Sequence, residues 1–378
     1  MYKDNKGDII LSFAPFFQIA VLMLQEFLIE SRLVEHESFR NISIALSALP
    51  MIAALFYIIK RKLNLLLIVY SVILFLILFT FIFFPDNERY IIDGAFYLLC
   101  INIPCFLCLV SIGDLVYLKK IILYLSYLIF VLGLIYCYFI WIGQIIFSVY
   151  SMSFSYYLLL PALVFVSQKK ILFTGLFMLI CMQMVFLGSR GGLVAAIIYA
   201  ILLAFIDDKN RKFRLISTIL MVILSGTLLS LFLKLSDKTG VTSRTLEMLQ
   251  QGDISNSTGR LDIYDTIWNS ILDSPYFGHG IYGDRVILDG IYCHNIFLEM
   301  FHNFGLFFGG GLILLILFSL IKGFLNSDND CKKLLLMFFC YGFIPFLVSG
   351  SYLNNAEFGL FIGSLFLLTK NTFVEYVL

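Results

Sequence analysis

Three residues of this sequence combine a cationic or imidazole side chain with a place at the end of an apolar segment. Arg190 lies in the segment GSRGGL, Arg260 begins a short polar stretch, and His294 precedes a long apolar run. A guanidinium offers a planar fork of N–H donors that matches phosphate oxygens, and a neutral imidazole can accept a proton near pH 7. We therefore predict that Arg190 and Arg260 bind a diphosphate and that His294 is a general base.

Each of these residues also has a structural interpretation. Arg190 would be an interface anchor that snorkels from a helix end. Arg260 would pair with Asp262 or with another loop carboxylate. His294 would be a helix cap or a packed ring, although its neighbour Asn295 and the positive end of the helix that follows favour the catalytic interpretation.

Three more polar residues follow at helical spacing. Asn295, Glu299 and His302 are four and three residues apart, which places them on one face of a helix, and we predict that they contribute to substrate binding. Glu299 would lie about one turn into the membrane, where an ionisable group usually faces a wet cavity or a partner. We expect it to line a cavity and orient a histidine; the alternative is a satisfied structural carboxylate. Close helix packing is expected at the glycines Gly305, Gly309, Gly310 and Gly311.

The composition indicates what surrounds these residues. Of 378 residues, 61% are hydrophobic and 13% are charged, and the mean hydropathy is +0.95. A soluble domain carries roughly 25% charged residues, so the sequence predicts a polytopic membrane protein with one membrane domain, residues 1–378. A basic face with interleaved aromatic residues is absent, so we expect no nucleic-acid partner.

The fold class predicted is all-α, with about twelve transmembrane helices. Each proposed span is an apolar run of suitable length. They are 9–29, 41–59, 63–84, 91–113, 119–141, 146–167, 171–187, 190–206, 213–234, 294–321, 333–349 and 356–369. The first run lacks a small-residue cleavage pattern, so we expect it to be a span and not a cleaved signal peptide.

The distribution of Lys and Arg predicts the orientation. Most basic residues of the short loops fall on the side of the N-terminus, which places both ends inside and the long loop 235–293 outside. This extracytoplasmic loop is expected to hold two short helices, 242–251 and 260–273. Because Ile263, Ile267 and Ile271 form one apolar stripe, we expect the second helix to lie along the membrane surface.

Other chemistries have no signature in the sequence. There is no P-loop, no HExxH and no cluster of His or Cys at metal-ligand spacing, and we expect neither a metal nor a cofactor. The eight cysteines fall mostly in apolar spans, so no disulfide framework is expected. Without nucleotide motifs, an outward-facing site would take an activated substrate that arrives through the lipid.

Several motifs of the second half of the chain resemble a known family. They are GSRGGLVAAII at 188–198, TGR with a Trp eight residues on, SPYFGHG at 274–280, and HNIFLEMFHNFGLFFGG at 294–310. In this order they resemble the O-antigen ligase and polymerase superfamily of bacterial envelope glycan assembly. The sequence departs from the family at Gly305 and Gly309, which are one residue further apart than the usual GxxG.

The resemblance implies a glycosyltransferase C-like enzyme of the bacterial inner membrane that works on the periplasmic side without metal. Its donor would be a glycan on undecaprenyl diphosphate, and membrane lipid and a chain-length regulator protein are candidate partners. Arg190 and Arg260 would hold the diphosphate, and His294 would take the proton of the attacking hydroxyl. Short loops, abundant Phe and modest length favour a polymerase, which extends a lipid-linked repeat unit, over a ligase, which transfers the glycan to lipid A core.

Two functions of other classes are alternatives. A flippase for lipid-linked oligosaccharides fits the number of spans, but it would need basic residues along a central passage, which the sequence lacks. A purely structural scaffold would keep glycan length unchanged when His294 or Arg260 is replaced by alanine.

Overall fold

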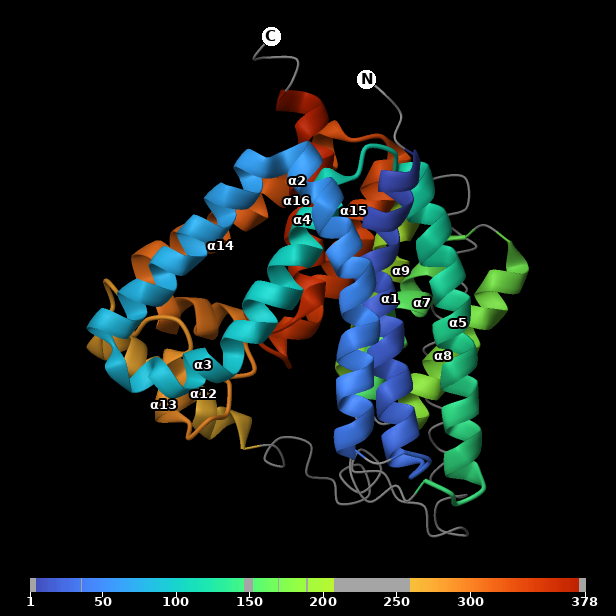
Figure 1. Cartoon of the computed structure of the whole chain (residues 1–378), viewed down its shortest axis with the longest axis horizontal. Helices are drawn as coiled ribbons and strands as arrows, with labels where there is room; N and C mark the ends of the chain where they lie inside the picture. The colour runs from blue at the N-terminus through green and yellow to red at the C-terminus, as the bar shows by residue number, and fades with distance from the viewer. Residues whose placement is uncertain are drawn as a thin grey trace. The chain divides into compact units, whose positions relative to one another are not determined.

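The computed structural model describes residues 5–34, 36–145, 152–168, 170–187, 190–206 and 259–373. Within these ranges the regular elements are all helical, as Figure 1 shows. The predicted span 213–234 and the predicted loop helix 242–251 lie outside the described residues. The chain divides into two compact units, which are Met1–Ala54 with Ile112–Ile254, and Leu55–Ser111 with Ser255–Leu378.

The first unit is built on aromatic contacts between its helices. Tyr136 stacks on Phe154 with 3.7 Å between ring centroids and meets Phe27 edge-on at 6.2 Å. Asp8 accepts a 2.8 Å hydrogen bond from the backbone N–H of Gly113, which ties the first helix to the residues before a later one. The helices of this unit are α1 (Asn5–Glu30), the first part of α2 (His36–Phe83), α5 (Leu115–Trp141), α6 (Met152–Tyr157), α7 (Leu159–Ser167), α8 (Ile171–Phe186) and α9 (Arg190–Ile206).

The second unit contains the residues from which the site is built. Its elements are the rest of α2, η1 (Pro85–Asn87), α3 (Glu88–Tyr97), the π-helical turn η2 (Leu98–Asn102), α4 (Ile103–Ser111), α12 (Arg260–Asp273), α13 (Gly283–Ile287), α14 (Ile296–Asn326), α15 (Asn329–Gly342), η4 (Ile344–Leu347) and α16 (Ala356–Phe373). Asn102 joins distant parts of this unit, because its amide donates to the carbonyls of Tyr352 at 2.7 Å and Leu353 at 3.2 Å.

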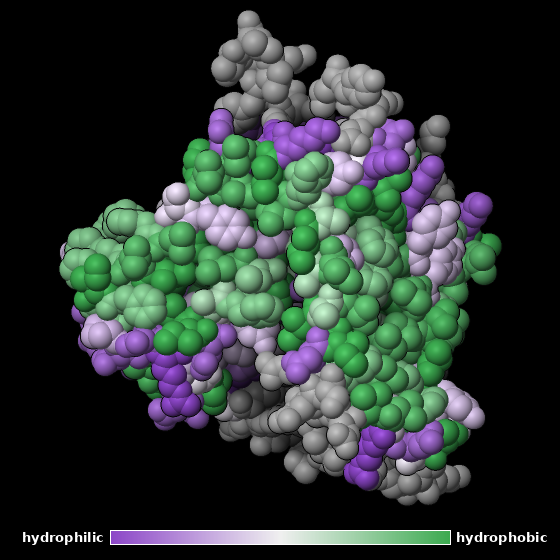
Figure 2. Space-filling view, in the orientation of Figure 1, coloured by the Kyte–Doolittle hydropathy of each residue, from purple (hydrophilic) through white to green (hydrophobic). Residues whose placement is uncertain are grey.

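Many helices of the described residues are suited to lipid. In the part of the chain that the structure describes, five stretches are long and apolar enough to cross a membrane: Asn5–Glu30, Asn41–Phe83, Pro85–Ser111, Leu115–Trp141 and Ile296–Asn326. Large apolar side chains stay exposed on α2 and α14, among them Phe75 and Phe318, and Figure 2 shows apolar residues across much of one face. Such exposure is expected where lipid is the solvent. The fold is thus that of a multi-pass membrane protein.

Several predicted spans agree with the helices. The predictions 9–29, 91–113 and 119–141 coincide with α1, with the run from η1 to α4, and with α5. The predictions 41–59 and 63–84 correspond to two helical pieces that meet at Lys62, whose φ of −144° and ψ of 35° are not helical. The total of twelve spans and the side of the membrane on which the long loop lies stay predictions.

Two predicted spans are interrupted. The prediction 294–321 agrees with the candidate span Ile296–Asn326, but α14 has a break inside it, because Gly305 has φ 77° and ψ 168°, a backbone conformation open mainly to glycine. The prediction 333–349 extends too far, since α15 ends at Gly342 and a 3-10 turn containing Pro345 follows. Proline cannot donate the backbone hydrogen bond that would continue the helix.

Candidate functional site around His294

Helix α12 has the bounds that the sequence predicts. Its buried side chains Ile267 and Ile271 are fully covered and pack with Cys293. The partly buried residues around them are Ile263, Leu288, Leu298, Phe301 and Leu306. The isoleucine stripe is therefore covered by apolar side chains of α14 and of the preceding loop. The place of α12 along the membrane surface stays a prediction.

The turn after α12 is held against the break in α14. Ser274 begins this turn and bonds across it, since its hydroxyl donates to the carbonyl of Gly278 at 3.0 Å. Three backbone hydrogen bonds then join the turn to α14: His279 N to His302 O at 2.8 Å, Gly280 N to Asn303 O at 3.0 Å, and Leu306 N to Pro275 O at 2.7 Å. The SPYFGHG segment and the HNFG segment are therefore one structural unit, which fixes α12 beside the start of α14.

His294 stands directly before α14 in an unusual backbone conformation. Its φ is 58°, in the left-handed region that non-glycine residues rarely adopt. Asn295 then caps the helix, because its side-chain oxygen accepts from the N–H groups of Phe297 at 3.0 Å and Leu298 at 3.3 Å. The His294 ring lies beside Tyr292, with 4.2 Å between centroids, and its Nδ1 has no hydrogen-bond partner among the described residues.

Arg260 acts on His294 through its charge. Burial, together with the smaller effect of the nearby positive charge of Arg260, lowers the pKa of His294 to about 4. Tyr264, one turn along α12 from Arg260, donates a 3.4 Å hydrogen bond to the carbonyl of His294. At neutral pH the His294 imidazole is thus uncharged and able to accept a proton.

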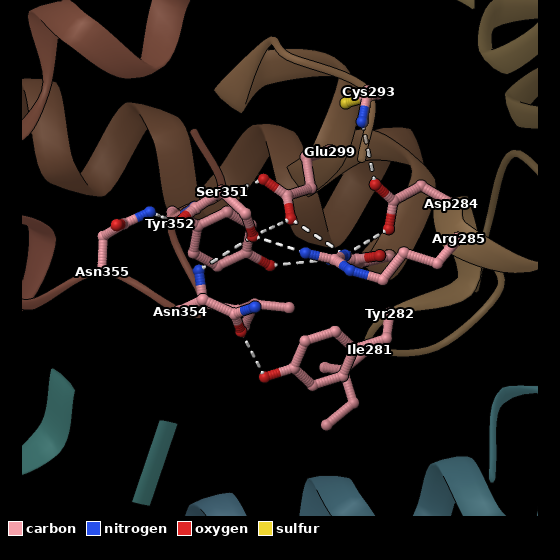
Figure 3. A network of polar contacts seen from close by, with 12 residues as sticks. Ile281, Tyr282, Asp284, Arg285, Cys293, Glu299, Ser351, Tyr352, Asn354 and Asn355 are labelled. Atoms are coloured by element: carbon pink, nitrogen blue, oxygen red, sulfur yellow. Dashed lines mark hydrogen bonds and ion pairs between the residues drawn. The ribbon is translucent and has the colours of Figure 1, made fainter. Parts of the chain in front are cut away.

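A buried ionic network joins α13, α14 and the residues after η4 (Figure 3). Arg285 Nη1 contacts Asp284 Oδ1 at 2.6 Å and Glu299 Oε1 at 3.2 Å, and its Nη2 donates to the Ser351 hydroxyl at 2.7 Å. The Ser351 hydroxyl donates in turn to Glu299 at 2.5 Å. The guanidinium also lies over the ring of Tyr282, 4.5 Å from its centroid, a cation–π contact.

The charges of this network depend on one another. Burial raises the pKa of Asp284, and the positive charge of Arg285 and the N–H of Cys293 oppose that rise. Burial lowers the pKa of Arg285, but the negative charges of Asp284 and Glu299 outweigh it and raise that pKa overall. Arg285 is therefore a permanent buried cation held between two carboxyl groups.

A pair of histidines links α12, the turn and α14. The rings of His279 and His302 stack with 4.4 Å between centroids and an interplanar angle of 15°. Each Nε2 lies 3.1 Å from the hydroxyl of Ser270 on α12. Among the described residues, no group of three or more His, Cys, Asp or Glu side chains is placed to hold a metal ion.

The structure brings together two of the three residues predicted to do chemistry. Arg260 and His294 are close enough for the charge of one to shift the pKa of the other. Arg190 begins α9 in the first unit, and its side chain lies outside the described residues. Its place beside the other two stays a prediction.

The three predicted substrate-binding residues have partners inside the protein. Asn295 caps α14, and His302 is fully buried against Ser270 and its stacked partner. Glu299 is also fully buried, and its partner is Arg285 and not a histidine. The alternative interpretation of Glu299, a satisfied structural carboxylate, describes these contacts.

Sequence reasoning missed Tyr264, Asp284, Arg285 and Ser351. The adjacent Asp284 and Arg285, upstream of a carboxylate in an apolar helix, are the signal that points to a buried ion pair, since Glu299 needs a cation at that depth. Ser351 lies 52 residues from Glu299 in the sequence, and no local pattern connects them.

The fold and this site together define a helical membrane protein with an arginine and a neutral histidine before a long apolar helix. Residues 173–316, which include both side chains, match the model of the O-antigen ligase family. The resemblance to the O-antigen ligase and polymerase superfamily is therefore confirmed over this segment, and it indicates a ligase- or polymerase-type function. Searches of curated proteins and of solved structures found no match.

Proposed function

We propose that this protein is a polymerase of O-antigen or a related surface polysaccharide. It transfers a growing glycan from undecaprenyl diphosphate to a lipid-linked repeat unit, on the periplasmic side of the bacterial inner membrane. The observation that carries the proposal is the uncharged imidazole of His294 beside the cation of Arg260 at the start of α14. The family match over this segment supports the same class of reaction.

In this reaction the two residues have separate tasks. A hydroxyl of the acceptor sugar attacks the anomeric carbon of the donor, and His294 takes the proton of that hydroxyl. The bond between the anomeric carbon and the diphosphate oxygen breaks, and undecaprenyl diphosphate leaves with one more negative charge. Arg260, joined in this proposal by Arg190, offsets that charge as it develops.

A bound diphosphate would also improve the base. In the free protein, burial and the charge of Arg260 hold the pKa of His294 at about 4, which makes a weak base. The negative charge of a diphosphate at Arg260 opposes that effect and raises the pKa of His294 toward neutrality, where general bases are most effective. The donor therefore prepares the proton acceptor that its own reaction needs.

The decisive experiment complements a strain that lacks the gene with wild-type protein or with R190A, R260A or H294A, and separates the envelope glycans on a gel. We expect the wild type to restore long chains and the three variants to leave single repeat units on the core. R89A, at an exposed arginine of α3, is the matched control and should restore long chains.

The same gel separates the alternatives. A ligase would leave the core without any O-antigen, whereas a flippase would leave repeat units on the cytoplasmic face. Normal chain length in both R260A and H294A would support the scaffold. Short chains of altered length distribution, in place of single units, would point to the contact with a chain-length regulator protein.

A further inference from the structure

We infer that Asp284 is a positioning residue for His294, through the side-chain oxygen that accepts the backbone N–H of Cys293. The inference rests on the proposed function of His294 as the base. It concerns residues of the loop 281–293 that touch neither reacting group. They act through the backbone that carries the imidazole.

The backbone conformation of His294 must be stabilised by contacts of the neighbouring residues. A left-handed φ of 58° places the Cβ of a non-glycine residue close to its own backbone, so a free chain would leave this conformation. It persists only where the neighbouring residues are fixed. On the C-terminal side they are fixed, because Asn295 caps α14 with two hydrogen bonds.

On the N-terminal side the fixed point is Asp284. Its Oδ2 accepts a 3.1 Å hydrogen bond from the backbone N–H of Cys293, the residue directly before His294. The Cys293 thiol donates to the carbonyl of Asn295 at 3.2 Å and so bridges His294. Because Asp284 and Cys293 are fully buried, no water competes for these contacts.

The carboxylate of Asp284 is itself held by a cation. Arg285 Nη1 contacts Asp284 Oδ1 at 2.6 Å, which leaves Oδ2 for the N–H of Cys293. The same guanidinium reaches Glu299 at 3.2 Å, one turn after the cap of α14. Figure 3 shows this chain of contacts from the helix, through the arginine, to the loop before His294. The network thus joins both sides of the residue that carries the base.

The test compares two variants that differ only at position 284, where one keeps an accepting oxygen and the other does not. One is D284N/R285M/E299Q and the other is D284A/R285M/E299Q. Both networks are neutral, so neither leaves an unpaired buried charge, and the asparagine variant keeps an oxygen for the N–H of Cys293. D289N, at an exposed aspartate of the same loop, is the control.

The first readout does not need glycan transfer. Diethyl pyrocarbonate modifies neutral imidazoles, and mass spectrometry follows the modification of His294 from pH 3.5 to pH 8 in detergent. We expect a midpoint near 4 for the wild type, the control and the asparagine variant. In the alanine variant the ring is released toward water and away from Arg260, and the midpoint moves up toward the ordinary value of about 6.5.

Equal midpoints in the two neutral variants would overturn the inference. If the alanine variant aggregates on size exclusion, the asparagine variant alone still tests the inference. A midpoint of His294 modification in that variant more than about one pH unit above the wild-type value would contradict positioning through the accepting oxygen. The second readout is transfer from a lipid-linked donor. We expect the alanine variant to lose about tenfold or more in kcat relative to the asparagine variant, with KM unchanged.

The two readouts separate this inference from the proposed function. A wild-type protein that transfers no glycan from lipid-linked donors contradicts the proposed function, while the midpoints still decide whether Asp284 positions His294. A change in KM alone would assign Asp284 to donor binding and contradict the inference.

Discussion

Gly278 and Gly305 lie backbone against backbone. A Cβ added to Gly278 would stand 2.5 Å from the nitrogen of Gly305, and one added to Gly305 would overlap the carbonyl of Tyr276. Both glycines have positive φ, 67° and 77°. This contact fixes the turn after α12 on the break in α14, and it explains why both segments carry glycine where they meet.

Alanine at Gly278 or Gly305 should destabilise the protein by about 3 kcal/mol or more, since it combines backbone strain with overlap of backbone atoms. G311A is the matched control, because nothing lies within 4 Å of the added methyl group and alanine suits a helix interior. The measurement is the thermal unfolding midpoint in detergent. A G305A midpoint equal to that of G311A would contradict the described contact.

The pH response of His294 should depend on Arg260. Because a positive neighbour disfavours the imidazolium, R260A should raise the pKa of His294 from about 4, though burial keeps it below about 6.5. R260K keeps the charge and should give a smaller shift. The pH dependence of diethyl pyrocarbonate modification measures the shift in both variants. An R260A midpoint equal to that of the wild type would contradict the electrostatic effect of Arg260 on His294.

The same shift predicts how stability depends on pH. His294 stays neutral in the folded protein down to about pH 4, whereas in the unfolded chain it takes up a proton near pH 6.5. The unfolded state therefore binds more protons between these values, and the free energy of unfolding falls as the pH decreases from 6.5 to 4. H294Q should weaken this dependence, which denaturant titrations at pH 6.5 and 4.5 would detect.

Ser270 should contribute to stability through the two histidines. S270A removes the hydroxyl that lies 3.1 Å from both Nε2 atoms, and it leaves the buried ring of His302 without that partner. We expect a loss of about 2–3 kcal/mol. S274A, which removes a hydroxyl bonded within the turn, should cost about 1 kcal/mol. Equal losses in the two variants would argue against the histidine bridge.

Substitutions at Asn295 should separate its cap from its predicted contact with substrate. N295A removes the cap of α14 and should cost about 1 kcal/mol, whereas N295D keeps an accepting oxygen at a helix N-terminus, where a carboxylate is favourable. N295D would also place a negative charge beside the proposed diphosphate. We therefore expect N295D to unfold like the wild type but to make shorter glycans, and full activity would remove Asn295 from the binding site.

Local sequence signals predicted the parts of the fold that depend on neighbouring residues. The bounds of α12 follow from Gly259 before it and Pro275 after it, and both act on the residues beside them. The start of α14 at Ile296 lies two residues from the predicted start of the span at 294, because the apolar run itself marks it. The places of Arg260 and His294 next to helix starts were likewise predictable, because residue type and helix start are local properties, while the chemistry expected of the two residues stays a prediction.

The parts that sequence reasoning missed depend on distant partners. The break at Gly305 depends on its contact with the turn near Tyr276, and the hydrophobicity of residues 294–321 carries no information about that contact. The ionic network requires Ser351 to return beside Glu299. For the isoleucine stripe, amphipathic spacing shows that one face is covered but not whether lipid or protein covers it, and Phe301 is part of that cover.

The break at Gly305 also changes how α14 fits the thickness of a bilayer. As one straight helix of 31 residues it would be about 46 Å long, well beyond a hydrocarbon layer of about 30 Å. Residues 306–326 alone measure about 32 Å at the same rise per residue. The remaining residues, 296–304, are not needed to cross a layer of this thickness. The segment that follows His294 can therefore have a different angle to the membrane from the rest of α14.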